Sequence, residues 1–231
     1  MRLILASASP RRTELLRAAG FEFETIVTDV DEAVRDGESP SIYVRRLAAE
    51  KSAAAMAALK GCATDDRAAP AALKGWATEN RTPPIDGPLP VAQAFRPAER
   101  IILAADTAVV VDDEILGKPR NDDDAAKMLR RLSGRRHEVL TGVSLRRGAY
   151  EVGRVETSAV NFAALTDEDI AWYVASGEGR DKAGAYAIQG LASRFIPRIE
   201  GSYSNVVGLP VACVYELLRE LAGSDWSAGA R

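Results

Sequence analysis

The stretch LILASASPRR, residues 3–12, contains a strand, a turn and the start of a helix in direct succession. Residues 3–6 form an apolar run that predicts a short buried strand. Ser9 followed by Pro10 is the typical pair of a helix N-cap and first helical residue, and Gly20 marks the end of that helix. A strand that turns at once into a helix favours an α/β fold.

The turn SASPRR, residues 7–12, also favours an anion-binding site. A helix start presents free backbone N–H groups and the positive end of the helix dipole. The hydroxyls of Ser7 and Ser9 add donors, and Arg11 and Arg12 add forked guanidinium groups that suit phosphate. A phosphate or a triphosphate fits this set, and the alternative is an ordinary capped helix with two solvated arginines.

Composition excludes several classes of protein. The 231 residues are 47% hydrophobic and carry a net charge of −3, so a broad basic surface for nucleic acid is not expected. Cys62 and Cys213 are far apart and lack metal-ligand spacing, which argues against disulfides and zinc. Apolar stretches stay well short of the ~20 residues that span a bilayer. We therefore expect a cytoplasmic protein that binds neither a membrane nor nucleic acid.

The rest of the chain alternates strands and helices, with one interruption. Between residues 61 and 99, which hold six of the eleven prolines, no sustained periodicity is present, and we interpret this segment as a mobile surface insertion. The expected elements are a strand at 23–28, a helix at 39–59, two strands within 101–119 separated by a polar break at 106–107, a helix at 122–134, a hairpin of 137–145 with 154–162, a helix capped by Thr166, a strand at 195–199, a loop at 200–210 and a helix at 210–221. This order predicts a single α/β domain around a mixed sheet with flanking helices.

Asp106 is the most informative polar residue, because it ends an apolar run, and an unpaired carboxylate is costly to bury there. We expect it to face a cleft, where it can bind a divalent cation or take a proton from water; the alternative is a carboxylate that caps a turn. Lys118, between a flexible glycine and a rigid proline, places a compact positive charge. The nucleotide-binding sequences G-x-x-x-x-G-K-[ST] and G-x-G-x-x-G are missing, so any nucleotide site uses another scheme.

Two further polar turns carry charges. DVDE, residues 29–32, includes Glu32, and DKAGAY, residues 181–186, includes Asp181 and Lys182. Carboxylates for Mg²⁺ and cations for phosphate are the groups that metal-assisted phosphoryl chemistry needs, although most acidic turns are merely solvated. Gln189 has an amide that can read a base edge. His137, the one histidine, is interpreted as structural.

Seven motifs together resemble the Maf family of nucleoside triphosphate pyrophosphatases. In chain order they are LASASPRR, DVDE, ADTAVVVD, LGKP, MLRRLSGRRHEVLTGV, DKAGAYAIQG and GSYSNVVGLP. The resemblance covers nearly all of the chain except about 60–100. It implies one domain over residues 1–231 with an elongated, twisted mixed sheet of the Maf and ITPase-like type. The insertion at about 61–99 is the main departure from the family pattern.

The resemblance also implies an activity: hydrolysis of a nucleoside triphosphate between the α and β phosphates with Mg²⁺ or Mn²⁺. DKAGAYAIQG resembles the subgroup that acts on dTTP and UTP, with CTP or modified pyrimidine nucleotides as further candidates, and a homodimer is expected. By position in the motifs, the implied roles are proton acceptor for Asp106, substrate choice for Arg11, Thr107 and Gln189, phosphate binding for Ser9, Arg12, Lys51, Lys118 and Lys182, and metal binding for Glu32 and Asp181. The alternative is a non-catalytic nucleotide-sensing regulator of cell division or septum formation.

Overall fold

The computed structural model describes residues 2–62 and 100–222. The insertion expected at 61–99 lies outside the described residues, apart from its first two positions, which belong to the end of a helix.

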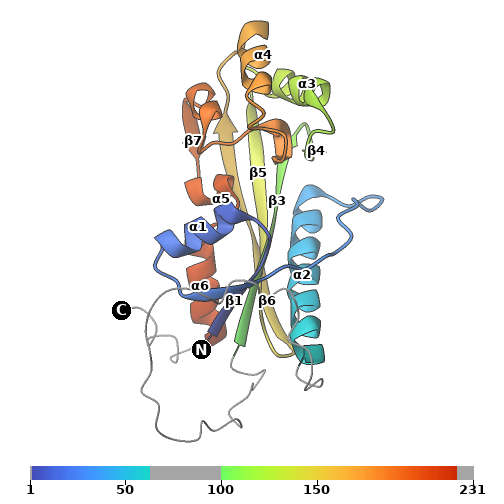
Figure 1. Cartoon of the computed structure of the whole chain (residues 1–231), viewed down its shortest axis with the longest axis vertical. Helices are drawn as coiled ribbons and strands as arrows, with labels where there is room; N and C mark the ends of the chain where they lie inside the picture. Colours follow the sequence, from blue (N-terminus) through green and yellow to red (C-terminus); the bar gives the residue numbers. More distant parts are fainter. Residues whose placement is uncertain (1, 63–99, 223–231) are drawn as a thin grey trace, which may run out of the picture.

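Seven strands form one mixed sheet with the order β2-β1-β3-β5-β6-β7, and β4 pairs with β3 beside this path. β1 is parallel to β2 and β3, whereas the other pairs are antiparallel. The long strands β3, β5 and β6 run along most of the molecule (Figure 1). The bounds are β1 Arg2–Ala6, β2 Phe23–Ile26, β3 Arg100–Val111, β4 Glu114–Leu116, β5 Arg136–Arg147, β6 Tyr150–Asn161 and β7 Arg198–Glu200. The predicted α/β fold with a mixed sheet is confirmed.

Three helices begin directly after the N-cap residues that the sequence predicts. Ser9 is the N-cap of α1 with Pro10 as its first residue, and Asn121 caps α3 through a hydrogen bond from the backbone N–H of Asp124. Thr166 and Asp169 form a reciprocal capping box at α4. The α-helices are α1 Pro10–Ala18, α2 Pro40–Cys62, α3 Asp122–Leu132, α4 Asp167–Ala175, α5 Tyr203–Val207 and α6 Val211–Ala222, and two 3₁₀ turns are η3 Ala183–Ala185 and η4 Leu191–Phe195.

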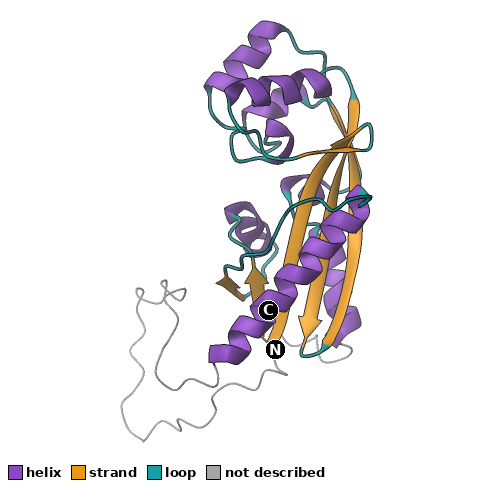
Figure 2. Cartoon of the chain, turned by 90° about the vertical axis from the view of Figure 1, so that its right-hand side faces the viewer, coloured by secondary structure: helices purple, strands orange, loops and turns teal. Residues whose placement is uncertain are grey.

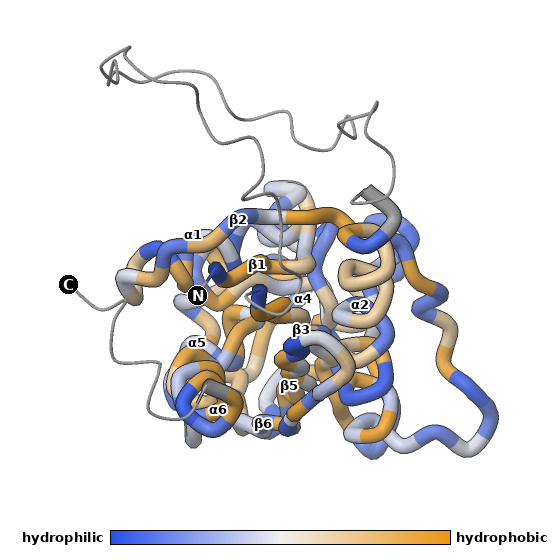
Figure 3. Tube along the Cα trace, turned by 90° about the horizontal axis from the view of Figure 1, so that it is seen from below, coloured by the Kyte–Doolittle hydropathy of each residue, from blue (hydrophilic) through white to orange (hydrophobic). Residues whose placement is uncertain are grey.

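Helices cover both faces of the sheet. α2 lies along one face, and α1 and α6 lie on the other, while α3 and α4 sit at one end of the long strands (Figures 1 and 2). Seen end-on, the apolar strands β1 and β3 lie between these helices (Figure 3). Side chains of β3 alternate accordingly: Ile102 and Ala104 pack with Met56 of α2, whereas Ile101 and Leu103 pack on the opposite face.

The strand that carries Asp106 differs from the prediction. We expected two strands with a polar break at 106–107, but β3 runs unbroken through these residues. The break lies in the neighbouring edge instead, because β1 pairs with β3 only up to Ala104 and β4 begins its pairing at Val109. Continuous pairing with β5 on the other side keeps the strand intact. The polar pair therefore lies within a continuous strand, beside an opening in the sheet edge, rather than ending a strand.

Helix α2 lies directly against the sheet at Gly142 of β5. A Cβ atom added to this glycine would lie 2.2 Å from the backbone oxygen of Val44 in α2. Only a residue without a side chain permits this approach. Gly142 therefore fixes how closely α2, and any side chain on it, approaches the sheet.

Smaller differences occur near the chain turns. The predicted loop at 200–210 contains the short helix α5, and the strand expected at 195–199 is β7, shifted to Arg198–Glu200. The short strand β4 follows a turn in which Asp112 and Asp113 both have positive φ. Among the described residues, every helix is too short or too polar to cross a membrane.

Candidate active site

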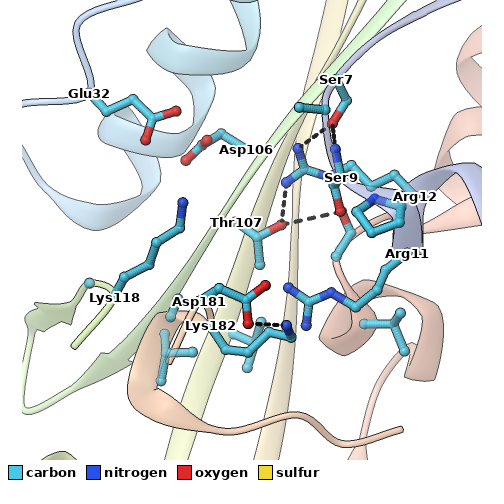
Figure 4. A pocket seen from close by; sticks show the side chains of 18 of the residues that line it. Ser7, Ser9, Arg11, Arg12, Glu32, Asp106, Thr107, Lys118, Asp181 and Lys182 are labelled. Carbon is cyan, nitrogen blue, oxygen red and sulfur yellow. Dashed lines mark hydrogen bonds and ion pairs between the residues drawn. The ribbon is translucent and has the colours of Figure 1, made fainter. Parts of the chain in front are cut away.

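A cleft with a volume of about 530 Å³ opens at the interrupted edge of β3. This volume lies in the usual range for small-molecule sites, ≈ 300–1,000 Å³. The turn after β1, the loop before α2, α2 itself, β3 and the turns at 117–118 and 181–188 all contribute to its wall. Figure 4 shows the polar side chains that converge on it from these separate segments. Of the predicted site residues, those that line the cleft are Ser9, Arg11, Arg12, Glu32, Lys51, Asp106, Thr107, Lys118, Asp181 and Lys182.

Asp106 is paired across the cleft with α2. Its carboxylate accepts a hydrogen bond of 2.7 Å from Nζ of Lys51, and both side chains are almost buried, with 11% and 12% of their surface exposed. The same ammonium donates a 2.6 Å hydrogen bond to the carboxylate of Glu32. The alternation of β3 places Asp106 on the sheet face that α2 covers. Two carboxylates therefore converge on one cationic position.

The loop that carries Glu32 is fastened to α2. Tyr43 donates its hydroxyl hydrogen bond to the backbone oxygen of Glu32, and burial raises the pKa of Tyr43 to about 12, so it remains a donor. Arg46 binds Glu38 and the carbonyl of Ala33. Burial alone would raise the pKa of the Glu32 carboxyl, but the hydrogen bond and charge of Lys51 outweigh it and the pKa lies below its ordinary value. Glu32 is thus a charged carboxylate held near Asp106.

A second charged group lies on the other side of the cleft. Arg11 points toward Asp181 and Lys182 (Figure 4). Burial lowers the pKa of Arg11, and the charge of Asp181 partly opposes this effect. Lys182 forms an ion pair with its neighbour Asp181. Two of the three charges are cationic, so this group can hold an anion.

Lys118 lies between these two groups and its ammonium points toward Glu32 and Asp106 (Figure 4). The turn before it is tied to the turn of Lys182, because the N–H of Gly184 donates to the carbonyl of Gly117 at 3.0 Å. Gly184 has φ +68° and a Cβ there would lie 2.9 Å from the side chain of Val109. The glycine in DKAGAY therefore allows this turn to pack against β3 and sets the place of both lysines.

The two adjacent arginines in the turn after β1 differ in burial and in hydrogen-bond partners. Arg12 is buried, and its guanidinium binds the carbonyls of Ala105 and Gly208 at 2.7 and 2.8 Å, whereas Arg11 faces the cleft. The hydroxyl of Ser7 accepts a hydrogen bond from the N–H of Ser9, which shapes the turn. Ser9 forms no side-chain cap to α1 in the described structure.

An apolar wall forms part of the cleft. It consists of Val109, Val139, Tyr186, Ile188, Val206 and Val207. Tyr186 is fixed by His137, whose Nε2 lies 2.8 Å from the tyrosine oxygen inside the core, as the structural interpretation of His137 predicts. Gln189 is exposed in the turn after Ile188, and it does not belong to the residues of the described chain that line the cleft.

The donor set fits a divalent cation that is shared with a substrate. Glu32 and Asp106 bring carboxylate oxygens to a position that an ammonium now holds, and Mg²⁺ is commonly bound by one or two carboxylates together with substrate phosphates. A closed protein cage is a different case: in the described ranges, 2–62 and 100–222, no group of three or more acidic, histidine or cysteine side chains is arranged for a metal. Asp181 lies with Arg11 and Lys182 instead of with Glu32 (Figure 4).

Sequence reasoning missed Tyr43 and Tyr186 as parts of this site. Tyr43 precedes Lys51 by eight residues on one helix, a spacing that places both on the same face, and this signal was available. Tyr186 carries no local signal, because its contact with His137 joins residues that are 49 positions apart.

The fold and the cleft define an α/β protein with an anion-binding site suited to phosphate chemistry. The chain belongs to the Maf family, since the family model described as "Maf-like protein" matches residues 2–221. A protein of Anaeromyxobacter dehalogenans named dTTP/UTP pyrophosphatase is 45% identical over 94% of this chain and 93% of its own length. Proteins with the same name from Methylococcus capsulatus and Shewanella oneidensis are 42% and 43% identical, covering 96% and 95% of this chain and 91% and 98% of their own lengths.

A solved structure titled "The structure of the Staphylococcus aureus Ham1 protein" matches with a TM-score of 0.41 at 15% identity, covering 71% of this chain and 72% of that one.

Proposed function

We propose that this protein hydrolyses pyrimidine nucleoside triphosphates, dTTP and UTP first, to the monophosphate and pyrophosphate. The observation that carries the proposal is the placement of the Asp106 carboxylate, buried and paired with Lys51, at the edge of a cleft lined by Arg11, Lys118 and Lys182. Relatives that carry the name dTTP/UTP pyrophosphatase support the choice of substrate.

The cationic side chains bind different phosphates of the triphosphate. Lys118 lies next to the carboxylate pair and suits the phosphate where reaction occurs, while Arg11 and Lys182 lie across the cleft and suit a neighbouring phosphate. The free N–H groups at the start of α1 add donors near Ser9. Together these groups hold the chain of phosphates in one orientation, which is a large part of catalysis in phosphoryl transfer.

Asp106 is the proton acceptor. A water oxygen forms a bond to the α-phosphorus while its proton passes to the Asp106 carboxylate. The bond from the α-phosphorus to the bridging oxygen breaks, and pyrophosphate leaves with that electron pair. Lys51 holds the carboxylate in place at 2.7 Å. General bases of this kind contribute roughly 10²–10⁴-fold to the rate.

Glu32, with Asp106 beside it, would hold a divalent cation, Mg²⁺ or Mn²⁺. When bound, such a cation supplies positive charge to the phosphate oxygens as negative charge develops. Lys51 holds the two carboxylates together at this position.

The apolar wall is suited to the nucleobase. A base can lie against Val139, Ile188 and Val207, which line the same cleft as the cationic groups that take the phosphates. Thr107 also lines this cleft, and Gln189 lies in the turn directly after Ile188. This arrangement is consistent with the substrate-choice role that we propose for Arg11, Thr107 and Gln189.

Pyrophosphate release from dTTP, UTP, CTP, GTP and 7-methyl-GTP tests the proposal, with wild type and Asp106→Asn compared in Mg²⁺ and in Mn²⁺. We expect wild type to prefer dTTP and UTP and the variant to lose roughly 10²–10⁴-fold in turnover while it still binds dTTP. A folded wild-type protein that releases no pyrophosphate from any of these triphosphates overturns the proposed function. Binding without turnover would instead support the regulator described above.

A further inference from the structure

The guanidinium of Arg12 forms its hydrogen bonds with other residues of the protein. Nε donates to the carbonyl of Gly208 at 2.8 Å, and Nη1 donates to the carbonyl of Ala105 at 2.7 Å and to Oγ of Ser7 at 3.3 Å. Nη2 donates to Oγ1 of Thr107 at 3.1 Å. A guanidinium has five N–H donors, so these four bonds leave one donor for any other partner.

Two of these acceptors belong to the residues on either side of Asp106. Ala105 and Thr107 face α1, whereas Asp106 faces α2, because side chains alternate along the strand. At this point no strand of the described residues pairs with this edge of β3, since β1 stops at Ala104 and β4 starts at Val109. Arg12 therefore supplies one hydrogen bond to the β3 backbone, at the carbonyl of Ala105, and one to the side chain of Thr107, at the place where a neighbouring strand would otherwise pair.

The other two acceptors join distant segments to the same point. Ser7 lies in the turn after β1, and Gly208 lies between α5 and α6, with φ +128°. Thr107 adds hydrogen bonds to Thr141 of β5 and to the carbonyl of Gly208. Arg12 as a residue is 9% exposed, so a substrate phosphate would have to displace these bonds to reach most of its donors.

We propose that Arg12 is a positioning residue that fixes the backbone around Asp106, and that its neighbour Arg11 is the arginine of this turn that binds substrate. The proposal rests on the proposed function, because it concerns the placement of the Asp106 carboxylate against the α-phosphorus. The two adjacent arginines of SPRR then have separate tasks. One reaches into the cleft, and the other holds the strand that carries the proton acceptor.

The first test compares Arg12→Lys with the matched variant Arg11→Lys. Lysine keeps the charge but cannot reach Gly208, Ala105 and Thr107 at once. For each protein, kcat and KM for dTTP are measured together with the Kd of α,β-imido-dTTP, a triphosphate analogue with a nitrogen at the reacting bridge. The number of analogue-binding sites gives the folded fraction, so that kcat is expressed per folded site.

We expect Arg12→Lys to lose roughly tenfold or more in kcat per folded site, with the Kd of the analogue unchanged within about threefold. Arg11→Lys is expected to raise the Kd of the analogue by roughly tenfold. A tenfold higher Kd of the analogue in Arg12→Lys, or an unchanged kcat per folded site, overturns the positioning role. Wild type without pyrophosphate release is a different result, because it overturns the proposed function itself.

A second measurement needs wild type alone and covers the case in which Arg12→Lys does not fold. The Nε–H of Arg12 is followed by NMR, assigned by through-bond correlation to the backbone of Arg12 in the wild-type protein. Because Gly208 accepts this hydrogen bond inside the protein, we expect slow hydrogen exchange and an unchanged signal when α,β-imido-dTTP is added. Rapid exchange in the free protein, or a large shift on addition of the analogue, overturns the proposal.

Discussion

Nζ of Lys51 lies 2.7 Å from Oδ1 of Asp106, so that α2 and β3 meet through an ion pair inside the cleft. A buried charge without its partner is costly, and the pair therefore holds both side chains in place. Because Lys51 also binds Glu32, one ammonium holds two carboxylates in position and lowers the pKa of Glu32 against the opposing effect of burial.

Replacement of Lys51 by methionine is expected to move the pH dependence of activity. The hydrogen bond and charge of Lys51 are what keep the pKa of Glu32 below its ordinary value against the opposing effect of burial. Without them this pKa rises, so Glu32 takes up its proton at a higher pH and the acid limb of the kcat/KM profile shifts upward. Profiles of wild type and Lys51→Met between pH 4 and 9 measure this; an acid limb at the same pH in both contradicts it.

Removal of the carboxylate charge at Glu32 is expected to weaken metal activation. Glu32→Gln keeps the size of the side chain but provides a poorer ligand, so we expect the Mg²⁺ concentration for half-maximal activity to rise by roughly tenfold. Asp181→Asn is the matched control, because Asp181 pairs with Lys182 away from Glu32. Titration of Mg²⁺ into each chelator-treated variant gives the result, and an equal shift in both variants would show that Asp181 shares the metal.

Stability is expected to fall in mild acid through His137. Burial lowers the pKa of His137 from 6.5 to about 4. The unfolded chain therefore binds a proton that the folded protein rejects between these pH values. This contribution to stability is complete above pH 6.5 and decreases as the pH falls toward 4, by about 3 kcal/mol in all.

Urea unfolding of wild type and His137→Leu at several pH values tests this expectation. The variant loses the hydrogen bond to Tyr186 at every pH, which adds a constant difference. Only the part of the difference in unfolding free energy that changes with pH reports the titration of His137. Free energies of unfolding that run parallel in the two proteins from pH 7 to pH 4 would show that His137 does not titrate in this way.

Gly142→Ala is expected to damage both stability and activity. Its Cβ would lie 2.2 Å from the backbone of Val44, so α2 must move away from β5 and carry Lys51 with it. Overpacking of this kind costs about 1–3 kcal/mol. Gly117→Ala is the stability control, because no atom of residues 2–62 or 100–222 lies within 4 Å of its added Cβ, apart from the neighbouring residues in the chain. Thermal unfolding of both variants measures the difference, and equal melting temperatures would contradict the close approach.

Local signals predicted much of the fold. Ser9 with Pro10, Asn121 and Thr166 mark helix starts through their own backbone neighbours, and the structure has helices at each of them. The apolar run of β1 and the hairpin of β5 with β6 are equally local. The Maf family membership indicated by the seven motifs is confirmed by the family model.

Motifs and charges are properties of the chain, so the residue types available for phosphate chemistry can be predicted without a structure. How these residues are used depends on how the chain folds. Asp106 sits within a continuous strand, since pairing with β5 overrides the polar break. Arg12 turns inward and Arg11 outward, because the carbonyls that satisfy a guanidinium come from residues 93 and 196 positions away. Such contacts follow from sheet order and helix packing, which no local pattern encodes.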